Sequence, residues 1–192
     1  MRRGRGAENA GSYTRQVPDL STRRRRDADV PALVEILVRQ QPETHYPFHW
    51  PSDRAPEDFI RRPGELASWV AELHGVVVGH VAIQSVADDD ELGQVWATAH
   101  GVPVAALRCV SVLFADRRLA RRGIGSALLQ RATDQALADG GAPVLDVVAE
   151  HREPRHLYLA RGWVEVGRSR PAWLPASAEP VYLMILPRTL GG

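Results

Sequence analysis

The strongest candidate for chemistry in the sequence is a short segment with two glycines, residues 121–126. It follows a run rich in Val and Leu and precedes apolar residues at helical spacing, which predicts a strand that passes into a helix. The first N–H groups of a helix have no acceptor within it and can bind phosphate oxygens. Gly123 and Gly125 lack a Cβ and let the backbone approach a ligand closely, while Arg121 and Arg122 add positive charge. The segment therefore predicts a site for a pyrophosphate group.

Two other nucleotide-binding motifs do not fit this segment. The Rossmann fingerprint needs a third glycine where Leu128 stands, and the P-loop needs a lysine, which the sequence lacks. A Gly-x-Gly pair alone is equally compatible with an ordinary tight turn. The assignment therefore depends on further residues.

Two blocks of the sequence resemble the GNAT superfamily of acetyl-CoA-dependent N-acetyltransferases. The first block, residues 113–129, matches without a gap the family's strand followed by Arg/Gln-x-x-Gly-x-Gly/Ala. The second matches the family's Asn-x-x-Ala-x-x-Leu-Tyr-x-x-x-Gly-Phe, and its residues are His151, Pro154, Leu157, Tyr158, Gly162 and Trp163. The resemblance covers about residues 22–186. It implies a mixed, mostly antiparallel central sheet with helices on both faces and a splayed strand pair that holds the cofactor.

The resemblance also implies roles for individual residues. Backbone N–H groups of residues 121–126 would bind the pyrophosphate of acetyl-CoA, and the end of the preceding strand would pair with pantetheine and polarise the thioester carbonyl. Tyr158 would lie near the sulfur as the catalytic proton donor. The predicted cofactor-binding residues are Leu113, Phe114, Ala115, Arg121, Arg122, Gly123, Ile124, Gly125, Ser126, His151 and Tyr158.

The acceptor site is expected in the aromatic-rich segment between the first two helices. In the family this segment forms one wall of that site, and here it contains Tyr46, Phe48, His49 and Trp50. Packing against the sheet is the alternative role for these side chains. No metal is predicted, because Pro47 separates His45 from His49 and no further ligands lie nearby.

Four positions depart from the family pattern. Ala120 replaces the Arg or Gln that opens the glycine motif, and Arg117 replaces the proline after the strand. His151 replaces an asparagine that usually contacts pantetheine. Cys109 occupies the strand position where some members carry a glutamate base. The sequence therefore leaves the general base open among ordered water, a histidine such as His49, and bulk solvent.

Apolar periodicity and turn residues predict one α/β domain over residues 22–192, preceded by a flexible tail over residues 1–21. Helices are expected from Asp27, over 56–62, from 124 to about 139, and over 154–161, with strands at 66–73, 76–86, 105–115, 144–148, 163–166 and 181–186. Residues 40–55 are predicted as a proline-broken loop and 88–91 as a solvated acidic turn. The pattern of residues 95–104 is ambiguous.

Composition limits the functional classes. The 192 residues carry a formal charge of +1, and all 24 basic residues are arginines, so a catalytic lysine is excluded. A single cysteine and the lack of a long apolar run predict a cytoplasmic protein without membrane association. We therefore expect an N-acetyltransferase that acts on a small amine acceptor, with a homodimer left open. The alternatives are a non-catalytic acyl-CoA sensor, suggested by Cys109, and a nucleic-acid-binding module, suggested by the arginines of residues 23–26.

Overall fold

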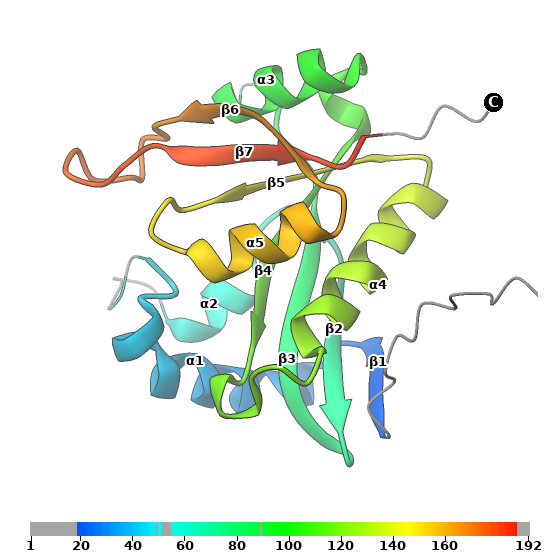
Figure 1. Ribbon diagram of the computed structural model, residues 1–192. Helices are drawn as coiled ribbons and strands as arrows, with labels where there is room; N and C mark the ends of the chain where they lie inside the picture. The colour runs from blue at the N-terminus through cyan, green and yellow to red at the C-terminus, as the bar shows by residue number, and fades with distance from the viewer. Residues whose placement is uncertain (1–18, 49, 51–54, 89, 188–192) are drawn as a thin grey trace, which may run out of the picture.

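The protein folds around one seven-stranded sheet with the strand order β1-β2-β3-β4-β5-β7-β6. The computed structural model describes residues 19–48, 50, 55–88 and 90–187. The strands are β1 Leu20–Arg24, β2 Glu65–Leu73, β3 Val76–Gln84, β4 Leu107–Ala115, β5 Ala142–Val147, β6 Val164–Ser169 and β7 Val181–Ile185. Only β4 and β5 are parallel, and the other neighbours are antiparallel. The predicted mixed, mostly antiparallel sheet is confirmed (Figure 1).

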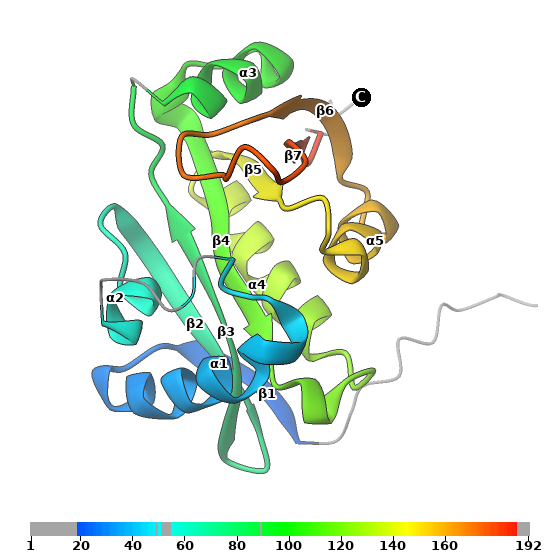
Figure 2. The same cartoon turned by 90° about the vertical axis from the view of Figure 1, so that its left-hand side faces the viewer.

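Helices cover both faces of this sheet, as predicted. The helices are α1 Val30–Thr44, α2 Pro56–Ile60, α3 Glu91–His100, α4 Ile124–Ala138 and α5 Arg152–Ala160, with short 3-10 turns at Asp27–Asp29, Val104–Ala106 and Arg117–Leu119. In Figure 2, α1, α2 and α3 lie on one face, and α4 and α5 lie on the other. Side chains of β5 alternate accordingly: Leu145 packs in the apolar cluster under α4, and Val144 packs in the cluster under α3.

The first helix is longer than the sequence indicated. Residues 40–55 were expected to form a loop, but α1 continues through Pro42 to Thr44. Pro42 lies in the last turn, where it cannot donate the helical hydrogen bond to the carbonyl oxygen of Val38, and the helix ends two residues later at Thr44. His45, with a φ of 51°, ends the helix in the left-handed region.

The acidic turn expected at residues 88–91 includes the start of a helix. Asp90 caps α3, because its Oδ1 accepts hydrogen bonds from the N–H groups of Leu92 at 2.8 Å and Gly93 at 3.2 Å. Leu92 and Trp96 then bury an apolar stripe against the sheet. The ambiguous segment 95–104 is therefore mainly helical.

The predicted boundary between tail and domain falls inside a strand. Leu20 and Ser21 belong to β1 and pair with Leu73 and Glu72 of β2. Because pairing with β2 orders these two residues, the folded domain begins earlier than residue 22. The remainder of the predicted tail, residues 1–18, lies outside the described residues.

The sheet opens between its two parallel strands, as the resemblance implied. β4 and β5 pair only where Leu107, Arg108 and Cys109 face residues 142–144, and β5 then turns away from β4 (Figure 1). On its other side β4 carries a β-bulge, because three steps from Ser111 to Phe114 oppose two steps on β3. Val112 sits in this bulge with a φ of 49°, which is unusual for a β-branched residue. The bulge increases the local bend of β4 beside the opening.

Candidate active site

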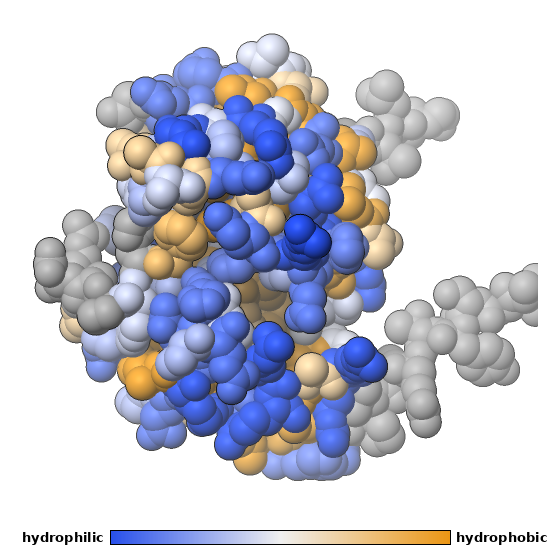
Figure 3. Space-filling view, turned by 60° about the vertical axis from the view of Figure 1, so that its left-hand side comes forward, coloured by the Kyte–Doolittle hydropathy of each residue, from blue (hydrophilic) through white to orange (hydrophobic). Residues whose placement is uncertain are grey.

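A cleft of about 1260 Å³ runs through the opening of the sheet. In Figure 3 a hollow near the middle of the molecule has an apolar floor and a rim of hydrophilic side chains. The sequence-predicted residues that line it are Tyr46, Phe48, Trp50, Leu113, Phe114, Ala115, Arg121, Arg122, Gly123, Ile124, Gly125, Ser126, His151 and Tyr158. His49 lies outside the described residues. Every other predicted site residue is thus brought to one cavity from segments far apart in the sequence.

The start of α4 forms one end of this cleft. Gly123 precedes the helix with a φ of 78°, a conformation that glycine adopts without strain, and Arg121 has a φ of 64°. A Cβ on Gly125 would have only Leu157 Cδ2 nearby, at 3.6 Å. The backbone here is open to the cleft, and the first N–H groups of α4 are free of acceptors within the helix. These residues fit a pyrophosphate group between the helix start and the two arginines.

Beyond the glycine turn, the open edge of β4 forms part of the cleft wall. The register of β4 and β5 ends at Cys109, so in the described sheet the later residues of β4, including Leu113 to Ala115, have no strand partner on that side. An extended, amide-containing chain such as pantetheine can pair with such an edge. The Oγ of Ser111 and the Nε2 of His151 are also buried without a hydrogen-bond partner among the described residues. The lining therefore offers polar atoms to a bound ligand.

Two tyrosines face the cleft from opposite sides of the sheet opening. Tyr158 on α5 is only 7% exposed, and its ring lies 6.2 Å from that of Trp163. Burial raises the pKa of Tyr158 well above its ordinary value of 10.0, and it raises the pKa of Tyr46 to about 12. Both hydroxyls are therefore protonated at neutral pH and are able to donate a proton or a hydrogen bond.

Cys109 lies on β4 at the last position that pairs with β5. Its thiol is partly buried, and burial raises its pKa far above the ordinary value of 9.0, with the charge of Asp146 acting in the same direction. A thiol in this environment stays protonated and is a poor nucleophile. The geometry therefore gives Cys109 a packing role.

Asp146 is one of the cleft residues that the sequence reasoning missed. It lies on β5 two residues after Val144, so both side chains project from the face of the sheet that α1, α2 and α3 cover. Burial raises the pKa of the Asp146 carboxyl, and the positive charge of Arg62 partly offsets this effect. A carboxyl group with a raised pKa is a candidate general base. The available signal was an aspartate inside the otherwise apolar strand expected at residues 144–148.

Aromatic side chains form the wall of the cleft on the α1 and α2 side. The ring of Tyr46 lies 5.5 Å from Phe59 of α2 in an edge-on contact and 5.9 Å from His151 at the start of α5. Phe48 and Trp50 line the same part of the cavity. Burial lowers the pKa of His151, so its imidazole is neutral at pH 7. The wall is thus mainly apolar, and the polar groups of Tyr46 and His151 in it are uncharged at pH 7.

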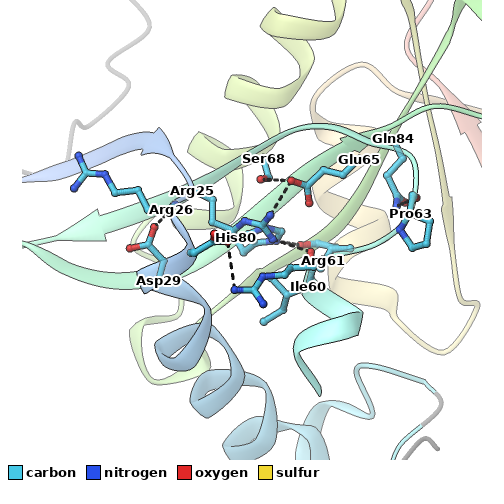
Figure 4. Close-up of polar contacts among 12 residues, drawn as sticks. Arg25, Arg26, Asp29, Ile60, Arg61, Pro63, Glu65, Ser68, His80 and Gln84 are labelled. Carbon is cyan, nitrogen blue, oxygen red and sulfur yellow. Dashed lines mark hydrogen bonds and ion pairs between the residues drawn. The ribbon is translucent and has the colours of Figure 1, made fainter. Parts of the chain in front are cut away.

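The arginines of residues 23–26 lie away from this cleft. Arg23 forms ion pairs with Asp29 and Glu72 at 2.7 and 2.8 Å. Arg25 donates to Glu65 at 2.9 Å and to the carbonyl oxygen of Ile60 at 3.0 Å, as Figure 4 shows. These contacts occupy two of the four arginines within the fold. Among the described residues, no group of three metal-binding side chains occurs, and no helix is long and apolar enough to cross a membrane.

Comparisons with known proteins agree with this fold. Residues 30–163 match the acetyltransferase (GNAT) family. The ribosomal-protein-S18-alanine N-acetyltransferase of Escherichia coli is 19% identical with a TM-score of 0.62, over 90% of this chain and 96% of that one. A GNAT-family acetyltransferase of Streptococcus pneumoniae is 25% identical with a TM-score of 0.61, over 86% and 97%.

A third similar structure, yncA, contains a cofactor. It is a putative acetyltransferase from Salmonella typhimurium with its cofactor acetyl-CoA, 18% identical with a TM-score of 0.63, over 87% of this chain and 92% of that one. No curated protein sequence matches the chain significantly.

Proposed function

Because the chain belongs to the GNAT acetyltransferase family and is therefore an acyltransferase, we propose that it transfers an acetyl group from acetyl-CoA to the amine of a small acceptor by direct attack in a ternary complex. One observation supports this proposal most strongly. The opening between β4 and β5 joins the glycine turn at the start of α4 to the aromatic wall on the opposite face. Donor and acceptor can thus meet inside the sheet from its two sides.

Residues of the chain would divide the proton transfers between them. When bound, acetyl-CoA supplies the acetyl group as a reactive thioester. Asp146 faces the acceptor side and can take a proton from the acceptor's ammonium group, directly or through water. Tyr158 holds its proton firmly and can deliver it to the departing thiolate. Arg121 and Arg122, with the first N–H groups of α4, would hold the pyrophosphate.

Separate measurements of binding and turnover test this proposal. We expect calorimetry to show binding of acetyl-CoA, and a panel of amines followed by CoA release to reveal at least one acceptor. Binding without turnover of any amine would favour the alternative of a non-catalytic acyl-CoA sensor. The raised pKa of Cys109 suits either function, but the half-buried carboxyl of Asp146, with its raised pKa, favours the enzyme.

A nucleic-acid-binding module remains the less favoured alternative. Two arginines of its proposed basic cluster, Arg23 and Arg25, are paired with carboxylates inside the fold. The formal charge of +1 gives the whole chain little attraction for a polyanion. We also propose a cytoplasmic location, because the sequence has a single cysteine and no long apolar run.

A further inference from the structure

The end of the cleft away from the glycine turn carries charges of both signs. Arg117, Arg121 and Arg122 belong to the loop before α4, so Arg62 is the one arginine lining the acceptor end within the described residues. Asp146, on β5, also lines the cleft, and the positive charge of Arg62 acts on its carboxyl group. An acceptor bound here therefore meets a carboxyl group and a guanidinium group together.

Arg62 is held by an aromatic stack. It is half-buried, and its guanidinium carbon lies 4.3 Å from the centre of the Phe59 ring, which in turn contacts Tyr46. Stacking on a ring face fixes the plane of the guanidinium and leaves its N–H edge for another ligand. The Arg62 side chain is therefore preorganised at the mouth of the acceptor site.

No ion pair neutralises Arg62 within the described part of the chain. By contrast, the partly buried Arg23 and Arg25 each have a carboxylate within 2.9 Å. Asp58 also lines the cleft but is exposed at its rim, and no ion pair joins it to Arg62. A guanidinium without an ion-pair partner in a cleft suits an anionic ligand group, most of all a carboxylate that can accept two parallel hydrogen bonds.

Arg62 acts on the same groups that surround the reaction centre. Its positive charge lowers the pKa of Tyr46, Cys109 and Asp146 relative to the effect of burial alone. Tyr46, Arg62 and Asp146 all line the same cleft. The rest of this end is aromatic, with Tyr46, Phe48 and Trp173 among the lining residues.

We propose that the acceptor is an α-amino acid with an apolar side chain, whose carboxylate binds Arg62 while its amino group faces Asp146. This assignment rests on the proposed function, because it names the acceptor of the same site. A polyamine carries no anion for Arg62, and the first residue of a protein has no free carboxylate next to its amine. The proposal therefore favours a free amino acid over a polyamine or a protein N-terminus as the acceptor.

Four probes that differ in charge test the proposal: L-phenylalanine, L-phenylalanine amide, 2-phenylethylamine and spermidine. Each is titrated calorimetrically into protein saturated with CoA, and each is assayed with acetyl-CoA. We expect L-phenylalanine to bind about tenfold or more tightly than its amide. In Arg62→Gln this preference should disappear, while binding of the amide should change little.

Arg61→Gln provides the matched control. Arg61 is the adjacent residue, 46% exposed, and its ion pair with Asp27 at 3.3 Å lies outside the cleft lining. This variant should keep the full preference for the acid. Equal binding of the acid and its amide, failure of L-phenylalanine to bind, or a preference that survives Arg62→Gln would each overturn the assignment.

Acetyl-CoA affinity measured on the same samples shows whether the acceptor assignment alone fails or the proposed function fails as well. If the wild type binds acetyl-CoA and acetylates an amine without regard to a carboxylate, only the acceptor assignment fails. If the wild type does not bind acetyl-CoA, the proposed function fails and the acceptor assignment fails with it.

Discussion

The Nδ1 of His80 lies 3.0 Å from the carbonyl oxygen of Val112, the bulge residue of β4. Since a carbonyl only accepts, Nδ1 carries the proton, and the buried Nε2 then has no partner among the described residues. His80 is fully buried on β3 beside Arg25 and Glu65 (Figure 4). A neutral imidazole on β3 thus stabilises the bulge of β4 beside the opening of the sheet.

The burial of His80 makes stability depend on pH. Burial lowers the pKa of His80 from 6.5 to about 4, so between these values the unfolded chain binds a proton that the folded protein does not. The stabilisation is fully present above pH 6.5 and is lost as the pH falls through about 4, a change of about 3 kcal/mol. Urea unfolding of the wild type and His80→Gln should therefore give free energies that converge as the pH is lowered. Parallel pH profiles would show that His80 is not buried in its neutral form.

Gly125→Glu should abolish acetyl-CoA binding and leave the fold intact. The nearest atom to an added Cβ is Leu157 Cδ2 at the ordinary contact distance of 3.6 Å, so the side chain fits. Its carboxylate would then repel the pyrophosphate at the start of α4. Leu137→Glu, at a 43% exposed position near the other end of α4, is the control. Normal cofactor binding by a folded Gly125→Glu protein would place the pyrophosphate elsewhere.

Tyr158→Phe should lower kcat by about 10²- to 10⁴-fold and leave acetyl-CoA affinity nearly unchanged. The phenyl ring keeps the contact with Trp163 and removes only the proton donor. Cys109→Ala should change turnover little, because the raised pKa keeps the thiol protonated. Steady-state kinetics with calorimetry distinguishes the two. Wild-type kcat in Tyr158→Phe would remove Tyr158 from the mechanism, and an inactive but cofactor-binding Cys109→Ala would assign a direct role to the thiol.

Asp146→Asn should reduce kcat/KM because an amide cannot accept the acceptor's proton. In the wild type, activity should fall on the acid side as Asp146 becomes protonated, and burial moves this limb above the pH at which exposed aspartates titrate. The pH profile of kcat/KM should lose this limb in Asp146→Asn. An unchanged limb together with unchanged kcat/KM would leave water or a histidine as the base.

Truncation locates the start of the folded domain. Removal of residues 1–18, whose composition lacks a burial pattern, should leave the melting temperature and acetyl-CoA affinity unchanged. Removal of residues 1–21 deletes Leu20 and Ser21 from β1 and should lower the melting temperature. Differential scanning fluorimetry of both proteins makes the comparison. A large fall in melting temperature on removal of residues 1–18 alone would mean that this segment also packs on the domain.

The sequence predicted the parts of the site that depend on local pattern. The glycine turn and Tyr158 each belong to a block of regularly spaced residues that resembles the GNAT pattern, and this resemblance predicted that both would lie at one cleft. The bulge at Val112 left no such signal, because it arises from the pairing of β4 with β3. Asp146 was missed for a similar reason: its access to the cleft depends on the register of β5, which follows from pairing with β4 and β7. Helix α3 was ambiguous until Asp90 could be seen to cap it.

The short register between β4 and β5 has a further consequence for the protein without its cofactor. Most sheets expose unpaired backbone groups only at their two outer strands, which here are β1 and β6. This sheet also has two inward-facing edges, on β4 beyond Cys109 and on the diverging part of β5. Such edges are templates for any extended chain. We expect a ligand that occupies the cleft to cover these edges and so to protect the protein from strand exchange and aggregation.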